Sequence, residues 1–562
     1  MSHLQFVYNL HAMYKYLRVH ETDNLVVALQ DLDQGEYVDI DEDTFPLLQS
    51  IRSKHKFVSR DLTKGEALIM YGVEVGRALR NLLKGEAIGV DDLMHSAGNY
   101  TLGSAGSKGW KAPSIEKWKD RTFDGFVRED GSVGTRNIWL VFPLVFCENR
   151  NVLVLKEEME DRLGYGRKTS KRTNMDLLIN GYRSGMSAEE LLQQNIDLTD
   201  LSRQGEKVFE QIDGLKFITH GVGCGETRQD SETFCRLMAG YVTNPNVAGA
   251  TVLSLGCQNA EVAMFKKAVH EKVSEYSRKL VILEQQQSSS ERAFIADAIK
   301  QTFAGMAEAN RMSRQAVSIE HLTIGLECGG SDGFSGISAN PTVGQVSDLL
   351  VAVGGKAILA EFPELNGVEQ ELINRCESLE VASKFSNLMA RYKLRAEQSG
   401  SGFHANPSPG NIRDGLITDA MKSAGAAKKG GTSPVRQVLD YTEKAERKGL
   451  SLLCTPGNDV ESTTGLAASG ANMILFTTGL GTPTGNPVVP VIKISSNTNL
   501  ANKMQDLIDF DTGEIIGGGK RIEQVAEELL ELIIEVASGK RDSKAMILQQ
   551  DDFIPWRRGI SL

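Results

Sequence analysis

The chain has 562 residues, of which 41% are hydrophobic and 24% charged, and a formal net charge of −11. A single hydrophobic core stops growing at about 250–300 residues, so we expect about three domains. The composition excludes a disordered or fibrous chain, and the interspersed charges offer neither a basic face for nucleic acid nor a polybasic membrane anchor, so a small-molecule partner is expected.

The N-terminus and the cysteines indicate the compartment. The N-terminal residues lack a basic segment followed by an apolar run, and no apolar run of about 18 residues occurs in the chain. Seven cysteines are an odd number spread over a long chain, which favours a reducing compartment over a disulfide framework. We predict a cytoplasmic protein with no membrane partner.

Short β-like runs alternate with glycine-containing turns from about residue 14 to residue 100. The turns read DQGE, TKGE and LKGE, which is typical of a small, mostly β module. The following stretch is rich in glycine, serine and lysine without apolar periodicity. We therefore predict a β domain at 1–104 and a linker at 105–120.

Apolar runs of strand length, separated by helical stretches, make up the rest of the chain; examples are NIWLVFPLVFC, ATVLSLGC, LTIGLEC and LSLLCTPGN. Near-continuous apolar strands alternating with helices indicate a mostly parallel sheet covered on both faces. The segment HANPSPGNIRDG interrupts this pattern near residue 400. We predict one α/β domain at 121–400, bearing the cysteines, and a C-terminal α/β domain at 401–562.

Five of the seven cysteines stand at or just after the end of a predicted buried strand; they are Cys147, Cys224, Cys257, Cys328 and Cys454. In open parallel sheets, ligands bind outside the carboxyl ends of the strands. Each cysteine alone is more often a small buried hydrophobe than a site residue, but the coincidence of several favours a site.

The loops after these strands combine glycine with polar side chains. The segment Glu327-Cys328-Gly329-Gly330-Ser331-Asp332 places three groups suited to metal binding or proton transfer within six residues. The cysteine spacing does not match structural zinc. A non-haem iron or manganese ion with mixed ligands, or an iron–sulfur cluster with one open iron, remain as alternatives.

Further candidates lie near the two ends of the chain. His20 offers an imidazole beside Asp23 and Asn24 at a turn, although a lone histidine at a turn is more often a cap or surface residue. The cations expected to approach an anionic substrate are Arg413, Lys428, Lys429 and Lys493. Neither a phosphate-binding loop nor a dinucleotide fingerprint is present.

These segments resemble the altronate and galactarate dehydratase family over nearly the whole chain. The resemblance rests on VHETDN, YGVEVGRA, DGSVGTRN, THGVGCG, LGCQN, GLECGGSDGFSGISANPTVGQVSD, NPSPGN, TPGNDVESTTGLAASG and TTGLGTPTGNPVVPVIKIS. It implies an N-terminal β-clip domain of the SAF type followed by Rossmann-like parallel-sheet α/β domains. It also implies a divalent metal, commonly Fe²⁺ or Mn²⁺, and a product of the 2-keto-3-deoxy class.

The family motifs imply that His20, Asp23, Cys257, Cys328 and Asp332 are site residues. Together with the loop residues, they define three predicted groups. The predicted catalytic residues are His20, Asp23 and His220. The predicted substrate-binding residues are Asn24, Gly329, Gly330, Ser331, Asn411 and Lys493. The predicted metal ligands are Cys224, Cys257, Cys328 and Asp332.

The predicted function is metal-assisted removal of water from a sugar acid, with D-altronate as substrate and 2-dehydro-3-deoxy-D-gluconate as product. Galactarate dehydration and carbon–sulfur lyase action on sulfolactate are the enzymatic alternatives, and a non-enzymatic sugar-acid binding protein is the other class. A homo-oligomer is compatible with the sequence. Residues 148–212, which are longer than expected and mostly helical by pattern, could alter substrate choice.

Overall fold

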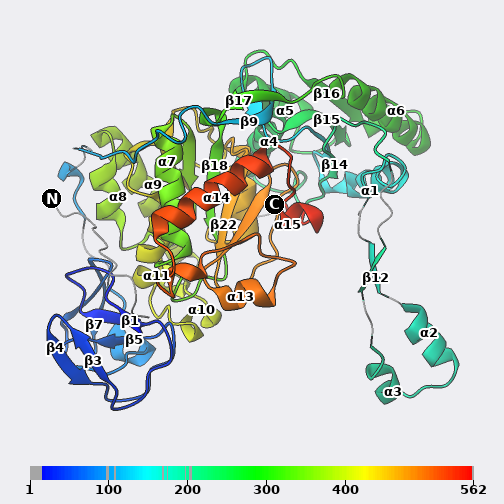
Figure 1. The fold of residues 1–562 in the computed structure, drawn as a ribbon. Coiled ribbons are helices and arrows are strands. Elements are labelled where there is room, and N and C mark those ends of the chain that lie inside the picture. The colour runs from blue at the N-terminus through cyan, green and yellow to red at the C-terminus, as the bar shows by residue number, and fades with distance from the viewer. Residues whose placement is uncertain are drawn as a thin grey trace.

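The computed structural model describes residues 15–96, 100–104, 106, 109–166, 170–173, 175–195, 198–201 and 206–559. It consists of a small N-terminal β domain, a middle α/β domain with a protruding arm, and a larger C-terminal α/β domain (Figure 1). The predicted fold class is confirmed. None of the described helices is long and apolar enough to cross a membrane.

The N-terminal domain contains three small antiparallel sheets. Their strands are β1 (Tyr16–Leu17), β2 (Leu25–Ala28) and β5 (Lys56–Val58); β3 (Tyr37–Ile40) and β4 (Asp43–Pro46); and β6 (Ala67–Met70), β7 (Val73–Ala78) and β8 (Leu93–Met94). Each of the three predicted turns has a glycine at φ between 80° and 87°, a region that other residues rarely adopt. The glutamate after each glycine accepts a hydrogen bond from the backbone N–H three residues earlier. The pairs are Gly35–Glu36, Gly65–Glu66 and Gly85–Glu86.

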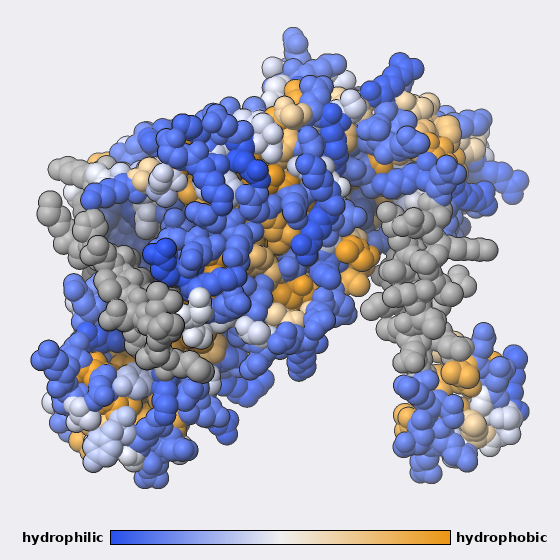
Figure 2. All heavy atoms as spheres, viewed as in Figure 1, coloured by the Kyte–Doolittle hydropathy of each residue, from blue (hydrophilic) through white to orange (hydrophobic). Residues whose placement is uncertain are grey.

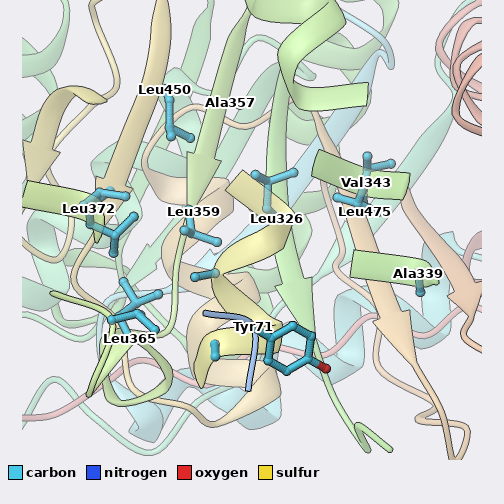
Figure 3. Packing of buried hydrophobic residues seen from close by; sticks show 14 of the residues in the cluster. Tyr71, Leu326, Ala339, Val343, Ala357, Leu359, Leu365, Leu372, Leu450 and Leu475 are labelled. Atoms are coloured by element: carbon cyan, nitrogen blue, oxygen red, sulfur yellow. The ribbon is translucent and has the colours of Figure 1, made fainter. Parts of the chain in front are cut away.

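This domain packs against the C-terminal domain through buried contacts. Tyr71 belongs to the same hydrophobic cluster as Leu326 and Leu365 of the C-terminal domain (Figure 3). Lys56 is fully buried and its Nζ donates to the carbonyl of Gly415 at 2.5 Å. The two domains therefore share one core.

The middle domain is built on a parallel four-stranded sheet in the order β14-β11-β15-β16. Its strands are β11 (Ile138–Pro143), β14 (Gly214–Phe217), β15 (Val247–Ser254) and β16 (Lys279–Glu284). The helices are α1 (Asn149–Met159), α4 (Arg228–Thr243), α5 (Val262–Lys272) and α6 (Glu291–Ala309). A small antiparallel sheet adjoins this domain and consists of β9 (Thr122–Val127), β10 (Val133–Gly134) and β17 (Gln315–Ser318).

An arm projects from the middle domain between α1 and β14 (Figure 1). It consists of the ribbon β12 (Ser170–Thr173) and β13 (Leu198–Leu201), with α2 (Met175–Arg183) and α3 (Ala188–Leu192) at its end. Apolar side chains are exposed there (Figure 2). The largest exposed fractions are 75% for Tyr182 and 83% for Leu192. The segment 148–212, predicted to be mostly helical, therefore consists of α1 followed by a ribbon that carries two short helices.

The C-terminal domain contains one parallel seven-stranded sheet in the order β20-β21-β19-β18-β22-β23-β24. Its strands are β18 (Thr323–Cys328), β19 (Lys356–Leu359), β20 (Val435–Leu439), β21 (Gly449–Leu453), β22 (Met473–Thr478), β23 (Val491–Ser495) and β24 (Phe510–Asp511). Because β18 and β19 lie between β21 and β22, the two strands from before residue 400 are flanked on both sides by strands from after it. The boundary predicted at residue 400 does not separate two sheets. Of the predicted linker, residues 105, 107 and 108 lie outside the described residues.

Helices cover both faces of this sheet. They are α7 (Ala339–Ala352), α8 (Glu369–Arg375), α9 (Leu379–Gln398), α10 (Pro409–Arg413), α11 (Asp419–Ala426), α12 (Asp459–Ala468), α13 (Thr498–Lys503), α14 (Ile522–Ala537) and α15 (Lys544–Ile547). Helices α7 and α14 share a core with Ile324 and Leu326 of β18. On the other face, α12 packs against α4 of the middle domain, where Gly240 lies against Ala468. The middle and C-terminal domains thus meet through α4 and α12.

Candidate functional site

A buried cysteine and two buried glutamates converge at the carboxyl edge of the seven-stranded sheet. Cys328 is the last residue of β18, and its Sγ lies 3.0 Å from Glu364 Oε2 and 3.4 Å from Glu361 Oε2. The ligand atoms of these three side chains all lie within 4.8 Å of one another. In the described part of the chain, no other three His, Cys, Asp or Glu side chains meet this limit.

Local structure explains why both glutamates face the same point. After β19, Glu361 adopts the left-handed conformation (φ 67°) and caps a 3₁₀ helix at Phe362–Leu365, whose second residue is Pro363. Glu361 directly precedes this short helix and Glu364 lies within it, and both side chains reach the Cys328 sulfur. A left-handed conformation in a residue other than glycine is strained and is typical of functional sites.

Two lysines complete what we call the Cys328 cluster: Cys328, Glu361, Glu364, Lys422 and Lys429. Lys429 is fully buried, and its Nζ lies 2.7 Å from Cys328 Sγ and 2.8 Å from Glu361. Lys422 contacts Glu364 at 2.6 Å. The two lysines are seven residues apart on α11 and the 3₁₀ turn after it, which is two helical turns and one face.

The charges in this cluster determine one another's ionisation. Burial alone would raise the pKa of Glu364, but Lys422 and Lys429 outweigh it and lower that pKa to about 2. Burial and the nearby Glu364 raise the pKa of Glu361. Burial, followed by Glu361 and Glu364, raises the pKa of Cys328 well above its usual value. The site therefore holds Glu364 as an anion beside a protonated thiol.

The donor set of the Cys328 cluster fits a divalent transition-metal ion. One sulfur and two carboxylates are mixed ligands of the kind that iron or manganese accepts. Glu361 Oε1 is buried with no hydrogen-bond partner among the described residues, so one ligand oxygen is unsatisfied. A bound cation would satisfy that oxygen.

The loop after β21 forms the more open side of the cluster. Asn458 caps α12 by accepting N–H groups from Val460 and Glu461, which places Asp459 at the first helical position. A Cβ atom on Gly329 would clash with the Asp459 carboxylate, so Gly329 allows that carboxylate to approach β18. Burial, then the charges of Glu361 and Glu364, raise the pKa of Asp459 to about 7.

Asp332 lies near the Cys328 cluster but has a full set of partners. Its Oδ1 accepts from Ser335 and Ser496, and its Oδ2 lies 2.9 Å from Lys54 of the N-terminal domain. Asn497 also donates to Oδ2 at 3.1 Å. In this arrangement Asp332 fixes the loop after β18 and binds the N-terminal domain to it. Asp332 is not among the side chains whose ligand atoms converge with Cys328, although it was predicted to bind the same metal.

The predicted N-terminal residues organise a turn. The Asp23 carboxylate accepts backbone N–H groups of His20, Tyr71 and Gly72. The Asn24 side chain pairs with the backbone of Ala67 and Ile69, which occupies both ends of its amide. The half-buried His20 ring bonds Thr22 and lies against Gly72. No contact in the described structure joins His20 to the Cys328 cluster.

His220 lies in the middle domain and both of its ring nitrogens are engaged. Nε2 bonds the Pro143 carbonyl at 2.8 Å, and Nδ1 accepts the Val222 N–H at 3.3 Å. The centroids of the His220 and Phe234 rings are 4.5 Å apart. Burial lowers the pKa of His220 to about 4. His220 is a neutral residue that joins the ends of β11 and β14. The structure does not bring it together with His20.

The remaining predicted substrate-binding residues mostly shape the loop after β18. Gly330 has φ 60°, and its carbonyl accepts from Gly479 and Leu480. The Asn411 side-chain amide donates to the Ser331 carbonyl. The Asn411 side-chain oxygen accepts from the backbone N–H of Ser408, the N-cap residue of α10. Lys493 instead lies within β23, and its Nζ donates to Gln550 at 2.5 Å. Burial lowers the pKa of Lys493 to about 8.

The predicted metal ligands divide between two sheets. Cys224 and Cys257 are exposed in loops of the middle domain, whereas Cys328 and Asp332 are buried beside the seven-stranded sheet. Because the two sheets are separate, these four residues do not form the single set that the sequence predicted. Cys454 is buried, and burial raises its pKa to about 12, as expected for a packing residue.

Sequence reasoning missed Glu361, Glu364 and Lys422, although it named Lys429 as an expected cation. The segment AEFPE carried a usable signal, because two glutamates stand directly after a buried strand. Charged residues at that position lie where ligands bind in parallel sheets.

Comparisons with known proteins match the whole arrangement of domains. Family models match residues 14–96 as an altronate/galactarate dehydratase SAF domain, 125–310 as the second domain of D-galactarate dehydratase/altronate hydrolase, and 319–561 as the C-terminal domain of D-galactarate/altronate dehydratase. The altronate dehydratase of Bacillus subtilis is 32% identical over 94% of this chain and 96% of its own. That of Escherichia coli is 33% identical over the same shares, and the galactarate dehydratase (L-threo-forming) of Escherichia coli is 29% identical over 94% and 93%.

Proposed function

This chain belongs to the altronate and galactarate dehydratase family and is a hydro-lyase, and we propose that it dehydrates D-altronate to 2-dehydro-3-deoxy-D-gluconate at the Cys328 cluster. The observation that carries the site assignment is the convergence of Cys328, Glu361 and Glu364 with two lysines at a parallel-sheet edge. Identity to two altronate dehydratases, 32% and 33%, supports altronate over galactarate.

Dehydration of a sugar acid requires loss of the C2 proton and departure of the C3 hydroxyl. Loss of the proton develops negative charge on the adjacent carboxylate, so that carboxylate needs cationic partners in the transition state. Lys422, whose side chain remains 11% exposed, is the cation that a substrate carboxylate can reach from the open side. The buried Lys429 holds Cys328 and Glu361 in position.

Asp459 is the proposed proton-transfer group. Its carboxyl stands on the open side of the Cys328 cluster, and its pKa of about 7 allows both protonation states near neutral pH. His20 remains the alternative named from the family motif, and it would have to act from the N-terminal domain.

Fe²⁺ or Mn²⁺ is the proposed metal, with Cys328, Glu361 and Glu364 as its ligands. Such an ion, when bound, supplies Lewis-acid stabilisation of charge on substrate oxygens. Glu327 supports this arrangement: it is fully buried and accepts from Ser462 at 2.6 Å. Burial and the Glu361 charge raise its pKa well above the usual value, so Glu327 adds no further negative charge.

The test is a substrate panel assayed under reducing conditions with Fe²⁺ or Mn²⁺. We expect a 2-keto-3-deoxy product from D-altronate and a smaller kcat/KM with galactarate. A larger kcat/KM with galactarate would transfer the assignment to that substrate. Sulfite release from sulfolactate would indicate the carbon–sulfur lyase alternative, and saturable binding without any product would indicate a sugar-acid binding protein.

The predicted homo-oligomer and cytoplasmic location remain predictions. The exposed apolar side chains on α2 and α3 of the arm support the oligomer. Sedimentation of the purified protein tests it.

A further inference from the structure

Three cysteines of the middle domain end up in adjoining loops. Cys147 follows β11, Cys224 follows β14 and Cys257 follows β15, and these are three neighbouring parallel strands. We call their loops the three-cysteine edge. All three thiols are exposed and none forms a disulfide.

Backbone hydrogen bonds hold the three loops together. The Phe146 N–H donates to the Val222 carbonyl at 3.0 Å, which joins the first loop to the second. The Ala260 N–H donates to the Gly223 carbonyl at 3.2 Å, which joins the third loop to the second. Gly223 has φ 105° and fits closely against Leu144, so the second loop lies directly on the first.

The sulfurs influence one another but do not converge on one point. Burial raises the pKa of Cys147, and Cys224 and Cys257 raise it further, so all three groups lie within electrostatic range. Yet their sulfurs are not all within 4.8 Å of one another, because the Cys328 trio alone meets that limit among the described residues. Thiolates on one tetrahedral zinc ion lie about 3.8 Å apart, given Zn–S bonds of about 2.3 Å. The spacing therefore favours a larger group than one ion.

The surroundings suit an anionic group. Helices α1, α4 and α5 each begin within five residues of one of the cysteines, so three N-terminal helix ends meet at this edge. Helix N-termini carry partial positive charge and free N–H groups, which stabilise anions. Gln286 already donates to Cys257 Sγ at 3.1 Å, the kind of hydrogen bond that stabilises cluster sulfur ligands. Glu148 opposes this effect, since it is buried beside Cys147.

We propose that Cys147, Cys224 and Cys257 bind a four-iron iron–sulfur cluster through three thiolates, at a site separate from the Cys328 cluster. Cysteine thiolates are the usual ligands of such clusters. With three protein ligands, one iron has no protein ligand and is available to an oxygen ligand from solvent or a small molecule. Binding releases the three thiol protons, because thiolates are the ligating form.

The experiment measures iron and acid-labile sulfide in the full-length protein, purified without oxygen and reconstituted with Fe³⁺, sulfide and a thiol reductant that converts part of the iron to Fe²⁺. We expect about four sulfides per chain and about four irons in addition to any ion at the Cys328 cluster, with the visible absorbance of iron–thiolate charge transfer. Cys147→Ser, Cys224→Ser and Cys257→Ser should each lose more than half of the sulfide, and the triple variant should lose all of it and keep at most about one iron per chain. The thermal midpoint of each variant, measured before reconstitution, verifies folding.

Cys328→Ser is the matched control, since it changes a strand-end cysteine of the other sheet. It should keep the sulfide content and lose at most about one iron per chain while lowering turnover, so failure of the proposed function and failure of this proposal are distinguishable. Iron and sulfide retained by the triple variant would overturn the proposal. So would a wild-type protein that takes up neither element, or that holds zinc without sulfide at these cysteines.

Discussion

The two sheet edges of this molecule use the same sequence feature, a cysteine at the end of a buried strand, in different chemical settings. At the seven-stranded sheet, Cys328 is 2% exposed and surrounded by two glutamates and two lysines. At the four-stranded sheet, Cys147, Cys224 and Cys257 are exposed and face one another's loops. Position at a strand end therefore marks where a site lies, whereas burial and neighbouring charges determine which chemistry it supports.

The largest expected effect is at the charged edge. Glu361→Gln removes one of the two carboxylates beside Cys328 and one charge opposite Lys429. We expect kcat/KM for D-altronate to fall about 10³-fold, since one preorganised electrostatic partner is commonly worth 10²–10³. Steady-state assays measure the loss, with the thermal midpoint as a check on folding.

The control for this variant is Glu380→Gln, an exposed glutamate in the first turn of α9. It should leave kcat/KM unchanged. Equal activity in Glu361→Gln and Glu380→Gln would remove the Cys328 cluster from the reaction.

The second comparison separates Asp459 from His20 as the proton-transfer group. Asp459→Asn should lower kcat about 10²- to 10³-fold with little change in KM, the range typical of general acid–base groups. His20→Gln should have the smaller effect, because its ring bonds Thr22 and lies against Gly72. A greater loss in His20→Gln than in Asp459→Asn would place the base on the N-terminal domain.

A smaller effect is expected where Gly329 meets Asp459. In Gly329→Ala the added methyl group would clash with the Asp459 carboxylate and displace it from β18. Displacement of a catalytic group by about 1 Å can cost roughly 10²-fold, so we expect a loss of 10- to 10²-fold in kcat. Gly518→Ala is a control for altering a glycine, since a Cβ there meets no atom within 4 Å, although its φ of 71° adds local strain. Similar kcat in Gly329→Ala and the wild type would contradict the assignment of Asp459.

The smallest effect at neutral pH concerns His220, at the other edge. Because burial lowers its pKa to about 4, the folded state binds fewer protons here than the unfolded state, whose histidine pKa is about 6.5. The stability from neutral His220 is fully present above pH 6.5 and is lost as pH falls toward 4, about 3 kcal/mol in all. His220→Gln should reduce this acid-induced loss while leaving activity at pH 7 nearly unchanged. Urea denaturation at pH 4, 5 and 7 measures it, and an identical pH dependence in the variant would contradict the account.

Sequence patterns predicted the classes of element and the edges at which sites lie, because buried parallel strands read as continuous apolar runs. Runs such as LTIGLEC and LSLLC became β18 and β21 as expected. The order of the strands was not predictable in this way. Residue 400 was taken as a boundary because local proline and glycine interrupt the pattern there, while β19 pairs with β21 across it.

The predicted set of metal ligands was wrong for the same reason, because local patterns do not show which strands share a sheet. Pooling Cys224 and Cys257 with Cys328 assumed one sheet, and two sheets exist. Glu361 and Glu364 were missed because a glutamate is usually a surface residue, and only the tertiary fold buries this pair against lysines. His20 and Asp23 were named from motifs, and their hydrogen bonds within the turn are visible only in the structure.

The most direct test of the central claim, that sugar-acid dehydration takes place at the Cys328 cluster, is a crystal structure of the Glu361→Gln variant with D-altronate and Mn²⁺. We expect electron density for the sugar acid with its carboxylate within hydrogen-bond distance of Lys422 and its C2 carbon facing Asp459. Density for D-altronate at the three-cysteine edge, with none beside Lys422, would contradict it.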